Sequence, residues 1–355
     1  VEFNDQGQLY DNDLANKALA RLDNLSNTRS INIVFTHGWH HFADKDDENV
    51  ISFISMLSQL ANEQALLPEE NRYKINGIYL GWRGDSITIP LLKYSTFSDR
   101  KKSAHKVGFG ATPIFLQIES IVKGKQNKNK LITIGHSFGG AVTYSALSPI
   151  LQERYISSRG LDNNEPNMIE GFGDLVVLIN PAFEALLHLP LFELTQQNCK
   201  PYNKKQPVRL MIVTSEADSS VRHIFRGGQL INGFIGDRFE DEKEVTACSG
   251  TDRDSSPRVY ESAAFKRSPG NFSATTTHCL ALNGEKFQVK HKNMVVDHNP
   301  YITIQTTEDI VPNHNSIWGQ HTISFLTEVL LSNLHSSEFE HVDDGTLHIS
   351  TCPIQ

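Results

Sequence analysis

The chain has 355 residues, of which 39% are hydrophobic, and its 41 acidic and 33 basic residues leave a net charge of −8. Its short basic segments carry no interleaved aromatic residues, so no nucleic-acid partner is expected. No run of about 18 apolar residues occurs, so no transmembrane helix is expected either.

The cysteines and the first residue bear on the compartment. Cys199, Cys248, Cys279 and Cys352 form no C-x-x-C pair, which argues against a zinc or redox motif. Their even number permits two disulfides or four free thiols. The chain begins with Val1, so we expect a processed or trimmed form, and a removed signal peptide stays among the alternatives. We expect a soluble protein and leave the choice between cytoplasm and secretion open.

The first half of the chain alternates strands with helices. In order, we expect a strand at 31–35, a helix at 50–64, a strand at 75–82, a helix at 113–122, a strand at 131–134 and a further helix. In the helix at 50–64, Ile51, Ile54 and Leu60 are expected to share the buried face. Residues 83–110 are long and mixed in character, and we interpret them as an insertion that walls part of a site.

The second half continues the same alternation. Buried strands are expected at 174–181, 208–214 and 301–306, and a closing helix at 316–334. Two stretches, 182–206 and 219–299, are interpreted as insertions. The first is rich in Leu and Phe, and it is either an apolar cap over a site or a helix packed on the sheet.

This order of elements predicts the fold class. Near-continuous apolar strands that alternate with helices are typical of an α/β fold, in which helices cover both faces of a mostly parallel sheet. No linker divides the chain cleanly, so we expect a single domain over 1–355 with the insertions named above.

The pentapeptide at 135–139, Gly-His-Ser-Phe-Gly, stands between an expected strand and an expected helix. A strand, a Gly-x-Ser-x-Gly turn and a helix, in that order, are typical of a nucleophile elbow, in which a sharp turn presents a serine. Gly135 and Gly139 keep the flanks of the turn small enough for it to close. Ser137 is therefore the candidate nucleophile.

A serine hydroxyl reacts well only when a base accepts its proton, and a histidine base is oriented by a carboxylate. Both partners should follow later strands, because the loops at the carboxyl ends of parallel strands converge. Asp218, just beyond the strand at 208–214, is the preferred acid, and Glu216 is its rival. His314 lies between the last strand and the last helix and is the candidate base.

Acyl transfer also needs donors for the developing oxyanion. The backbone N–H of Phe138, which follows the candidate nucleophile, can supply one. The N–H of Trp39 is the candidate for the other, and Gly38 before it lets the chain turn. The alternative is a plain turn with a core tryptophan. No metal site is expected at His40 and the neighbouring histidines, because no carboxylate stands there at ligand spacing.

These elements together resemble the lipase and esterase type of α/β-hydrolase, over about residues 31–334. The order Ser137, Asp218, His314 is that family's order of nucleophile, acid and base. The resemblance implies the α/β-hydrolase fold, with an oxyanion hole formed by the N–H groups of Trp39 and Phe138 and with no cofactor. The long insertion at 219–299 departs from the family pattern.

The expected function is hydrolysis of carboxylic esters through an acyl-enzyme, with hydrophobic or lipid esters favoured. The expected partners are an ester or lipid substrate and, transiently, a membrane or lipid surface. The alternatives are a thioesterase, amidase or acyltransferase that uses the same residues, or a non-catalytic binding protein of the same fold. The oligomeric state is left open.

Overall fold

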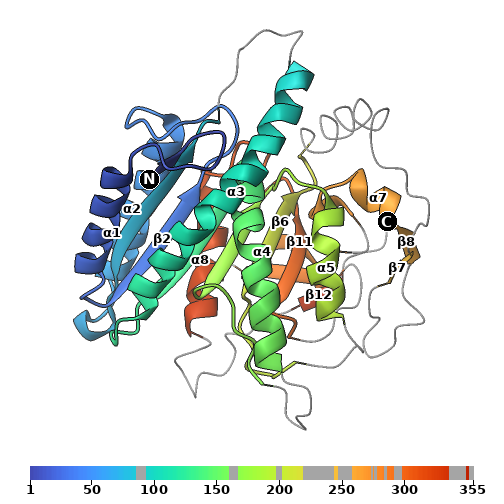
Figure 1. Ribbon diagram of the computed structural model, residues 1–355. Helices are drawn as coiled ribbons and strands as arrows, with labels where there is room; N and C mark the ends of the chain where they lie inside the picture. Colours follow the sequence, from blue (N-terminus) through green and yellow to red (C-terminus); the bar gives the residue numbers. More distant parts are fainter. Residues whose placement is uncertain are drawn as a thin grey trace. The chain divides into compact units, whose positions relative to one another are not determined.

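The computed structural model describes residues 1–84, 93–159, 167–196, 202–218, 244–246, 258–272, 275, 278–283, 286–291, 298–335 and 349–351. Figure 1 shows the helices and strands coloured along the chain, which divides into two compact units. The first comprises Val1–Pro149 and Phe172–Leu178, and the second comprises Ile150–Gly171 and Ile179–Gln355. Cys199, Cys248 and Cys352 lie outside the described residues, as do parts of all three proposed insertions.

The first unit is built on a parallel sheet with the strand order β1-β3-β2-β4-β5. The strands are β1 (Glu2–Phe3), β2 (Ser30–Thr36), β3 (Lys74–Trp82), β4 (Lys130–His136) and β5 (Leu175–Ile179). β2 pairs in parallel with β3 on one side and with β4 on the other. Every residue of β2 and β4 is buried, as central parallel strands require when both faces are covered.

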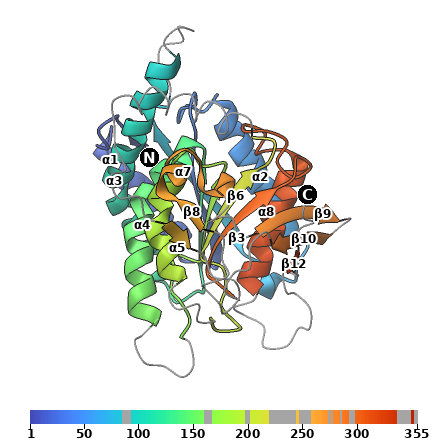
Figure 2. The same cartoon turned by 90° about the vertical axis from the view of Figure 1, so that its right-hand side faces the viewer.

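The helices of this unit lie on both faces of its sheet. They are α1 (Asn12–Leu25), α2 (Glu48–Ala65) and α3 (Lys93–Lys123), with the first turns of α4 (Phe138–Arg159). α2 connects β2 to β3, whereas α3 returns from β3 past β2 to β4. Because such crossovers are right-handed, opposite steps place the two helices on opposite faces, as Figure 2 shows. The predicted α/β class, with a mostly parallel sheet and flanking helices, is confirmed.

α3 is longer than the sequence predicted, because two glycines serve close packing and do not end the helix. A Cβ placed on Gly110 would lie 1.9 Å from the carbonyl oxygen of Gly7. A Cβ on Gly108 would lie 2.6 Å from a backbone carbonyl oxygen of α4. Neighbouring backbone therefore approaches α3 where these residues lack side chains. From residue 93 onward, the segment interpreted as an insertion at 83–110 belongs to this helix.

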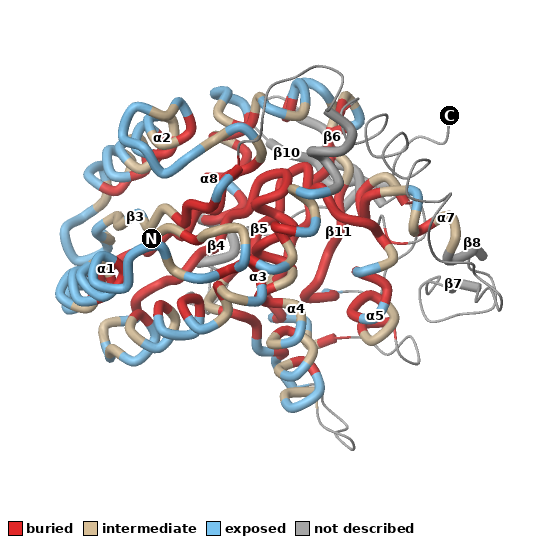
Figure 3. The backbone as a smooth tube through the Cα atoms, turned by 45° about the horizontal axis from the view of Figure 1, so that its top comes forward, coloured by how far each residue is buried: buried red, intermediate tan, exposed pale blue. Residues whose placement is uncertain are grey.

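α2 buries a face different from the predicted one. Ile51 and Ile54 are 54% and 55% exposed, whereas Phe53 and Met56 are buried with Leu60. The ring of Phe53 stacks on that of Phe35 in β2, with centroids 5.4 Å apart. An aromatic ring buries more apolar area than an isoleucine, so Phe53 determines the helix orientation. Figure 3 shows the exposed outer surface of α2 and the buried strands beneath it.

In the second unit, neighbouring strands follow the order β6-β11-β9-β10-β12. Its strands are β6 (Leu210–Ser215), β9 (His278–Asn283), β10 (Lys286–His291), β11 (Tyr301–Thr306) and β12 (Ile349–Thr351). β6 and β11 run parallel, and their register places Ser215 opposite Thr306 at the carboxyl ends. β10 is antiparallel to β9. A separate antiparallel pair, β7 (Glu244–Thr246) and β8 (Arg258–Tyr260), completes the strands described in this unit.

Helices pack around these strands as well. They are α5 (Ala185–Thr195), α7 (Glu261–Phe265) and α8 (Gln320–His335), and two 3₁₀ turns, η1 (Glu69–Asn71) in the first unit and η4 (Pro269–Asn271) here, complete the set described. α5 packs Leu189 and Phe192 against Ala264 and Phe272, although Leu187 is 44% exposed. Most apolar side chains of α5 therefore serve the core of their own unit. In the described parts of the chain, no helix is long and apolar enough to span a membrane.

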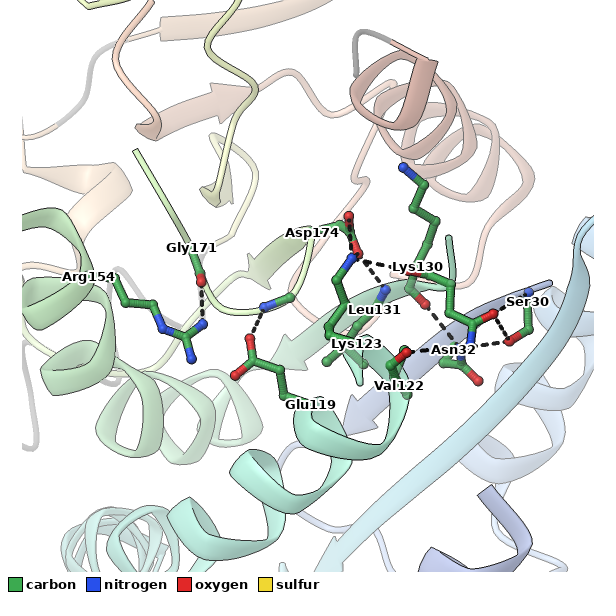
Figure 4. A network of polar contacts seen from close by, with 12 residues as sticks. Ser30, Asn32, Glu119, Val122, Lys123, Lys130, Leu131, Arg154, Gly171 and Asp174 are labelled. Atoms are coloured by element: carbon green, nitrogen blue, oxygen red, sulfur yellow. Dashed lines mark hydrogen bonds and ion pairs between the residues drawn. The ribbon is translucent and has the colours of Figure 1, made fainter. Parts of the chain in front are cut away.

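A polar network holds together the amino ends of strands in the first unit. Asn129, directly before β4, is buried; its Oδ1 accepts the N–H of Ser30 at 3.0 Å, and its Nδ2 donates to the carbonyl of Ser26 at 2.7 Å. Asp174 accepts the N–H of Leu131 at 2.8 Å and pairs with Lys123 at 3.0 Å (Figure 4). These side chains accept or donate hydrogen bonds to backbone groups that would otherwise be unpaired at the amino ends of these strands.

We predict that Asn129→Ala lowers the free energy of unfolding by about 3 kcal/mol, because several buried groups lose their partner and each costs about 1–3 kcal/mol. Urea denaturation measures the change. The control is Asn62→Ala on the exposed face of α2, which should stay within about 0.5 kcal/mol of the parent. Equal, small effects of the two substitutions would show that the network contributes little.

Candidate active site

Ser137 makes the turn between β4 and α4 on its own. β4 ends at His136 and α4 begins at Phe138. The φ of Ser137 is +55°, a left-handed conformation that is uncommon and strained for residues other than glycine. Its carbonyl accepts the N–H of Ala141 at 3.2 Å, so Ser137 caps the amino end of α4. This is the strand–turn–helix geometry that a nucleophile elbow requires.

Two glycines make this turn possible. A Cβ on Gly139 would lie 2.1 Å from the carbonyl oxygen of Thr36 and 2.4 Å from that of His37. A Cβ on Gly135 would lie 2.8 Å from the carbonyl oxygen of Gly139. Since real Cβ atoms do not approach oxygen so closely, the start of α4 can rest against the end of β2 only when both positions lack side chains.

The loop after β2 lies directly beside Ser137. A Cβ on Gly38 would lie 2.9 Å from the Cβ of Ser137. In the sheet, β2 lies between β3 and β4. The chain passes from β2 to β3 on one side, and β4 pairs with β2 on the other side. The carboxyl ends of β2 and β4 therefore flank a topological switch point, where open α/β sheets bind their ligands.

His37 holds this loop in place as a neutral side chain. Its Nε2 accepts the N–H of Trp82 at 3.1 Å, which leaves the hydrogen on Nδ1, and that nitrogen donates to the carbonyl of Gly38 at 2.8 Å. The indole N–H of Trp82 donates to the carbonyl of His37 at 2.8 Å. Burial lowers the pKa of His37 to about 4, so it is uncharged at neutral pH.

Aromatic side chains surround the predicted oxyanion donors. The Trp39 ring stacks on His40, with centroids 4.2 Å apart, and meets the Phe138 ring edge-on at 6.2 Å. The ring of Trp82, which is fully buried, meets Phe138 edge-on at 6.4 Å. The structure thus brings together the two residues whose N–H groups were predicted to form the oxyanion hole. That role itself stays a prediction.

A histidine–carboxylate pair that the sequence did not reveal anchors the same loop. The Nδ1 of His41 lies 3.1 Å from the carboxylate of Asp47. Asp47 also caps α2, by accepting the N–H of Asn49 at 2.8 Å. The pair joins the loop after β2 to the helix that follows. Among the described residues, no group of three or more His, Cys, Asp and Glu is arranged to hold a metal ion.

In the second unit, Asp218 and His314 form a close pair. Oδ2 of Asp218 lies 2.8 Å from Nδ1 of His314, with the carboxylate fully buried and the imidazole 15% exposed. A carboxylate can only accept, so Nδ1 carries the hydrogen and Nε2 holds the lone pair that can receive a proton. Such a pair can orient a general base and stabilise its charged form.

The same geometry separates the two candidate acids. The side chain of Glu216 is exposed, and its backbone N–H donates to the carbonyl of Thr306 at 2.9 Å. Asp218 is buried, and its carboxylate contacts His314. The structure therefore pairs Asp218, and not its rival, with the candidate base.

Asn180 is a further residue of this region that the sequence did not single out. It follows β5, is fully buried and has a φ of +44°. Its side chain contacts both the end of β6 and the loop that carries His314. The signal was the Asn-Pro dipeptide directly after a buried strand, which marks a turn with a special backbone conformation.

We predict that Gly139→Ala destabilises the protein by about 3 kcal/mol, the upper end of the usual cost of overpacking, because the new methyl group meets two carbonyl oxygens. Urea denaturation measures the loss. Gly319→Ala is the matched control, because a Cβ there has nothing within 4 Å. A Gly139→Ala variant as stable as the Gly319→Ala variant would contradict the packing described for the elbow.

Comparison with known proteins assigns the chain to no family. The sequence matches no family model, and no curated protein matches it. The candidate residues form one group in each unit: the Ser137 turn with its flanking loop in the first, and the Asp218–His314 pair in the second.

Proposed function

We propose that this protein is a serine hydrolase that cleaves carboxylic esters, with Ser137 as nucleophile, His314 as base and Asp218 as acid. The observation that carries the proposal is the 2.8 Å contact between the buried carboxylate of Asp218 and Nδ1 of His314. The strained turn at Ser137 supports it independently. That the serine acts with the pair, which belongs to the other unit, is inferred from the chain order.

We further propose that the fold is that of the α/β-hydrolases. In that fold the nucleophile follows a central strand in an elbow, and an oxyanion donor comes from the loop after an earlier strand. Here the elbow follows β4 and the His37 loop follows β2. Asp218 follows β6 and His314 follows β11, so the acid precedes the base in the chain as it does in that family.

The mechanism follows from these roles. Oγ of Ser137 attacks the ester carbonyl while Nε2 of His314 takes its proton, and Asp218 stabilises the imidazolium that forms. The N–H groups of Phe138 and Trp39 stabilise the negative charge on the carbonyl oxygen. His314 then gives the proton to the departing alcohol, which leaves an acyl-enzyme. A water molecule, deprotonated by the same imidazole, releases the acid and restores Ser137.

The surroundings of Ser137 support an apolar substrate. Gly38 offers no side chain, and the aromatic rings of Trp39 and Phe138 pack on each other next to the nucleophile. Trp39 is partly exposed and Phe138 is buried behind it, and an accessible aromatic ring favours contact with hydrocarbon over contact with a charged group. We therefore propose hydrophobic esters, lipids included, as the substrate class, with transient contact at a lipid surface as part of the same proposal.

We predict that a fluorophosphonate probe labels the native protein on Ser137. Ser137→Ala should abolish labelling because the nucleophile is gone, and His314→Ala should reduce it by several orders of magnitude because no base remains. Gel fluorescence and mass spectrometry of the labelled peptide measure the outcome, with circular dichroism to confirm folding. Absence of labelling in folded native protein would refute the proposed function.

We predict that the two candidate acids differ sharply in their effect on hydrolysis of a p-nitrophenyl ester. Asp218→Asn should lower kcat by about 10⁴-fold, because the amide favours the wrong histidine tautomer and cannot stabilise the imidazolium. Glu216→Gln is the matched control and should leave kcat unchanged, because its side chain is exposed. The opposite pattern would assign the acid to Glu216.

A further inference from the structure

Asn180 stands at the point where the acid and base segments of the second unit meet. Its Oδ1 accepts the backbone N–H of Ser215, the last residue of β6, at 2.9 Å. Its Nδ2 donates to the carbonyl oxygens of Asn313 and His314 at 3.4 and 3.3 Å. The oxygen and the nitrogen of one amide side chain thus bond two segments that are far apart in the sequence.

The backbone of Asn180 is adapted to this position. Its φ of +44° is left-handed, and its own N–H donates to the carbonyl of Val213 in β6 at 2.7 Å. Asparagine tolerates this conformation better than most residues with a side chain. The turn directs a fully buried amide toward the ends of β6 and the loop after β11.

The contact between Asp218 and His314 depends on these two segments. Asp218 is held near the end of β6 by its N–H bond to the carbonyl of Ser215, at 3.2 Å. The hydroxyl of Ser215 in turn donates to the carbonyl of Val311, at 2.5 Å. Asn180 adds the connection to His314 itself, so the backbone of the base is tied to the strand end that carries the acid.

We infer that Asn180 is a positioning residue, which holds the His314 loop against the end of β6 and so maintains the Asp218–His314 contact. This inference rests on the proposed function. Asn180 does not touch the reacting atoms; it acts through the backbone of the base. Groups that orient a catalytic side chain in this way commonly change activity by about 10- to 100-fold when removed.

The test compares Asn180→Gly with the native protein. Glycine accepts a positive φ without strain, so the variant removes the amide while the backbone conformation is kept. We expect kcat for a p-nitrophenyl ester and the rate constant of fluorophosphonate labelling to fall about 10- to 100-fold, with KM unchanged. The kcat per labelled site is the decisive readout, because a merely structural role would lower the amount of folded protein and leave this value unchanged.

Two further variants make the result decisive. Lys128→Gly places the same glycine at another left-handed position, with φ +56°, on the exposed turn before β4, and should leave kcat and KM unchanged. Asn180→Asp keeps the shape and the acceptor for Ser215 but removes the donor to the base loop. It should lower kcat as well, and it serves as the test if the glycine variant does not fold.

The outcomes separate this inference from the function on which it rests. If native protein is labelled and a folded Asn180 variant keeps the native kcat and labelling rate, Asn180 has no positioning role. A loss of folded protein with an unchanged kcat per labelled site would show a merely structural role and overturn the inference too. If native protein is not labelled at all, the proposed hydrolase function fails first.

Discussion

The one-residue turn at Ser137 is the constraint on which the first unit depends. A serine at φ +55° is tolerated only because the surrounding backbone fixes it. That backbone arrives within 2.1 Å of where a Cβ of Gly139 would lie, so the start of α4, the end of β2 and the turn form one packed structure. Close backbone packing, which is possible because Gly139 has no side chain, therefore holds the strained turn in place.

In the second unit, hydrogen bonds from side chains to backbone carbonyl groups hold the loop that carries His314. The loop after β11 has little regular structure, yet Asn180, Ser215 and Thr322 each bond one or more of its carbonyl oxygens. Buried carbonyl groups without partners would cost free energy, so these bonds determine the path of the loop. The position of His314 then follows from that path, which places its imidazole against the carboxylate of Asp218.

Local patterns in the sequence predicted strands β2 to β6 and β11, the elbow and the residues of the Asp218–His314 pair, because each depends on short-range order along the chain. They did not predict β1 or the strands β7 to β10, which lie in the stretch interpreted as an insertion. Long-range packing decided the rest. Phe53 stacks on Phe35, so α2 buries the face that carries Phe53 and leaves the predicted isoleucine face exposed. Helix α3 continues through Gly110, where the backbone of Gly7 packs closely against it. Asn180 was missed for the same reason: both partners of its amide are distant in sequence, and a single buried asparagine carries no periodic signal.

The environment also separates the roles of histidines that look alike in the sequence. Both ring nitrogens of His37 are engaged by backbone groups, and burial lowers its pKa to about 4. It can neither accept a proton from a substrate nor release one at neutral pH, so it serves the loop and not the reaction. His314 instead gives one nitrogen to a carboxylate and remains 15% exposed. The carboxylate at Nδ1 orients the imidazole and stabilises its charged form, which is why the proposed chemistry is assigned to His314.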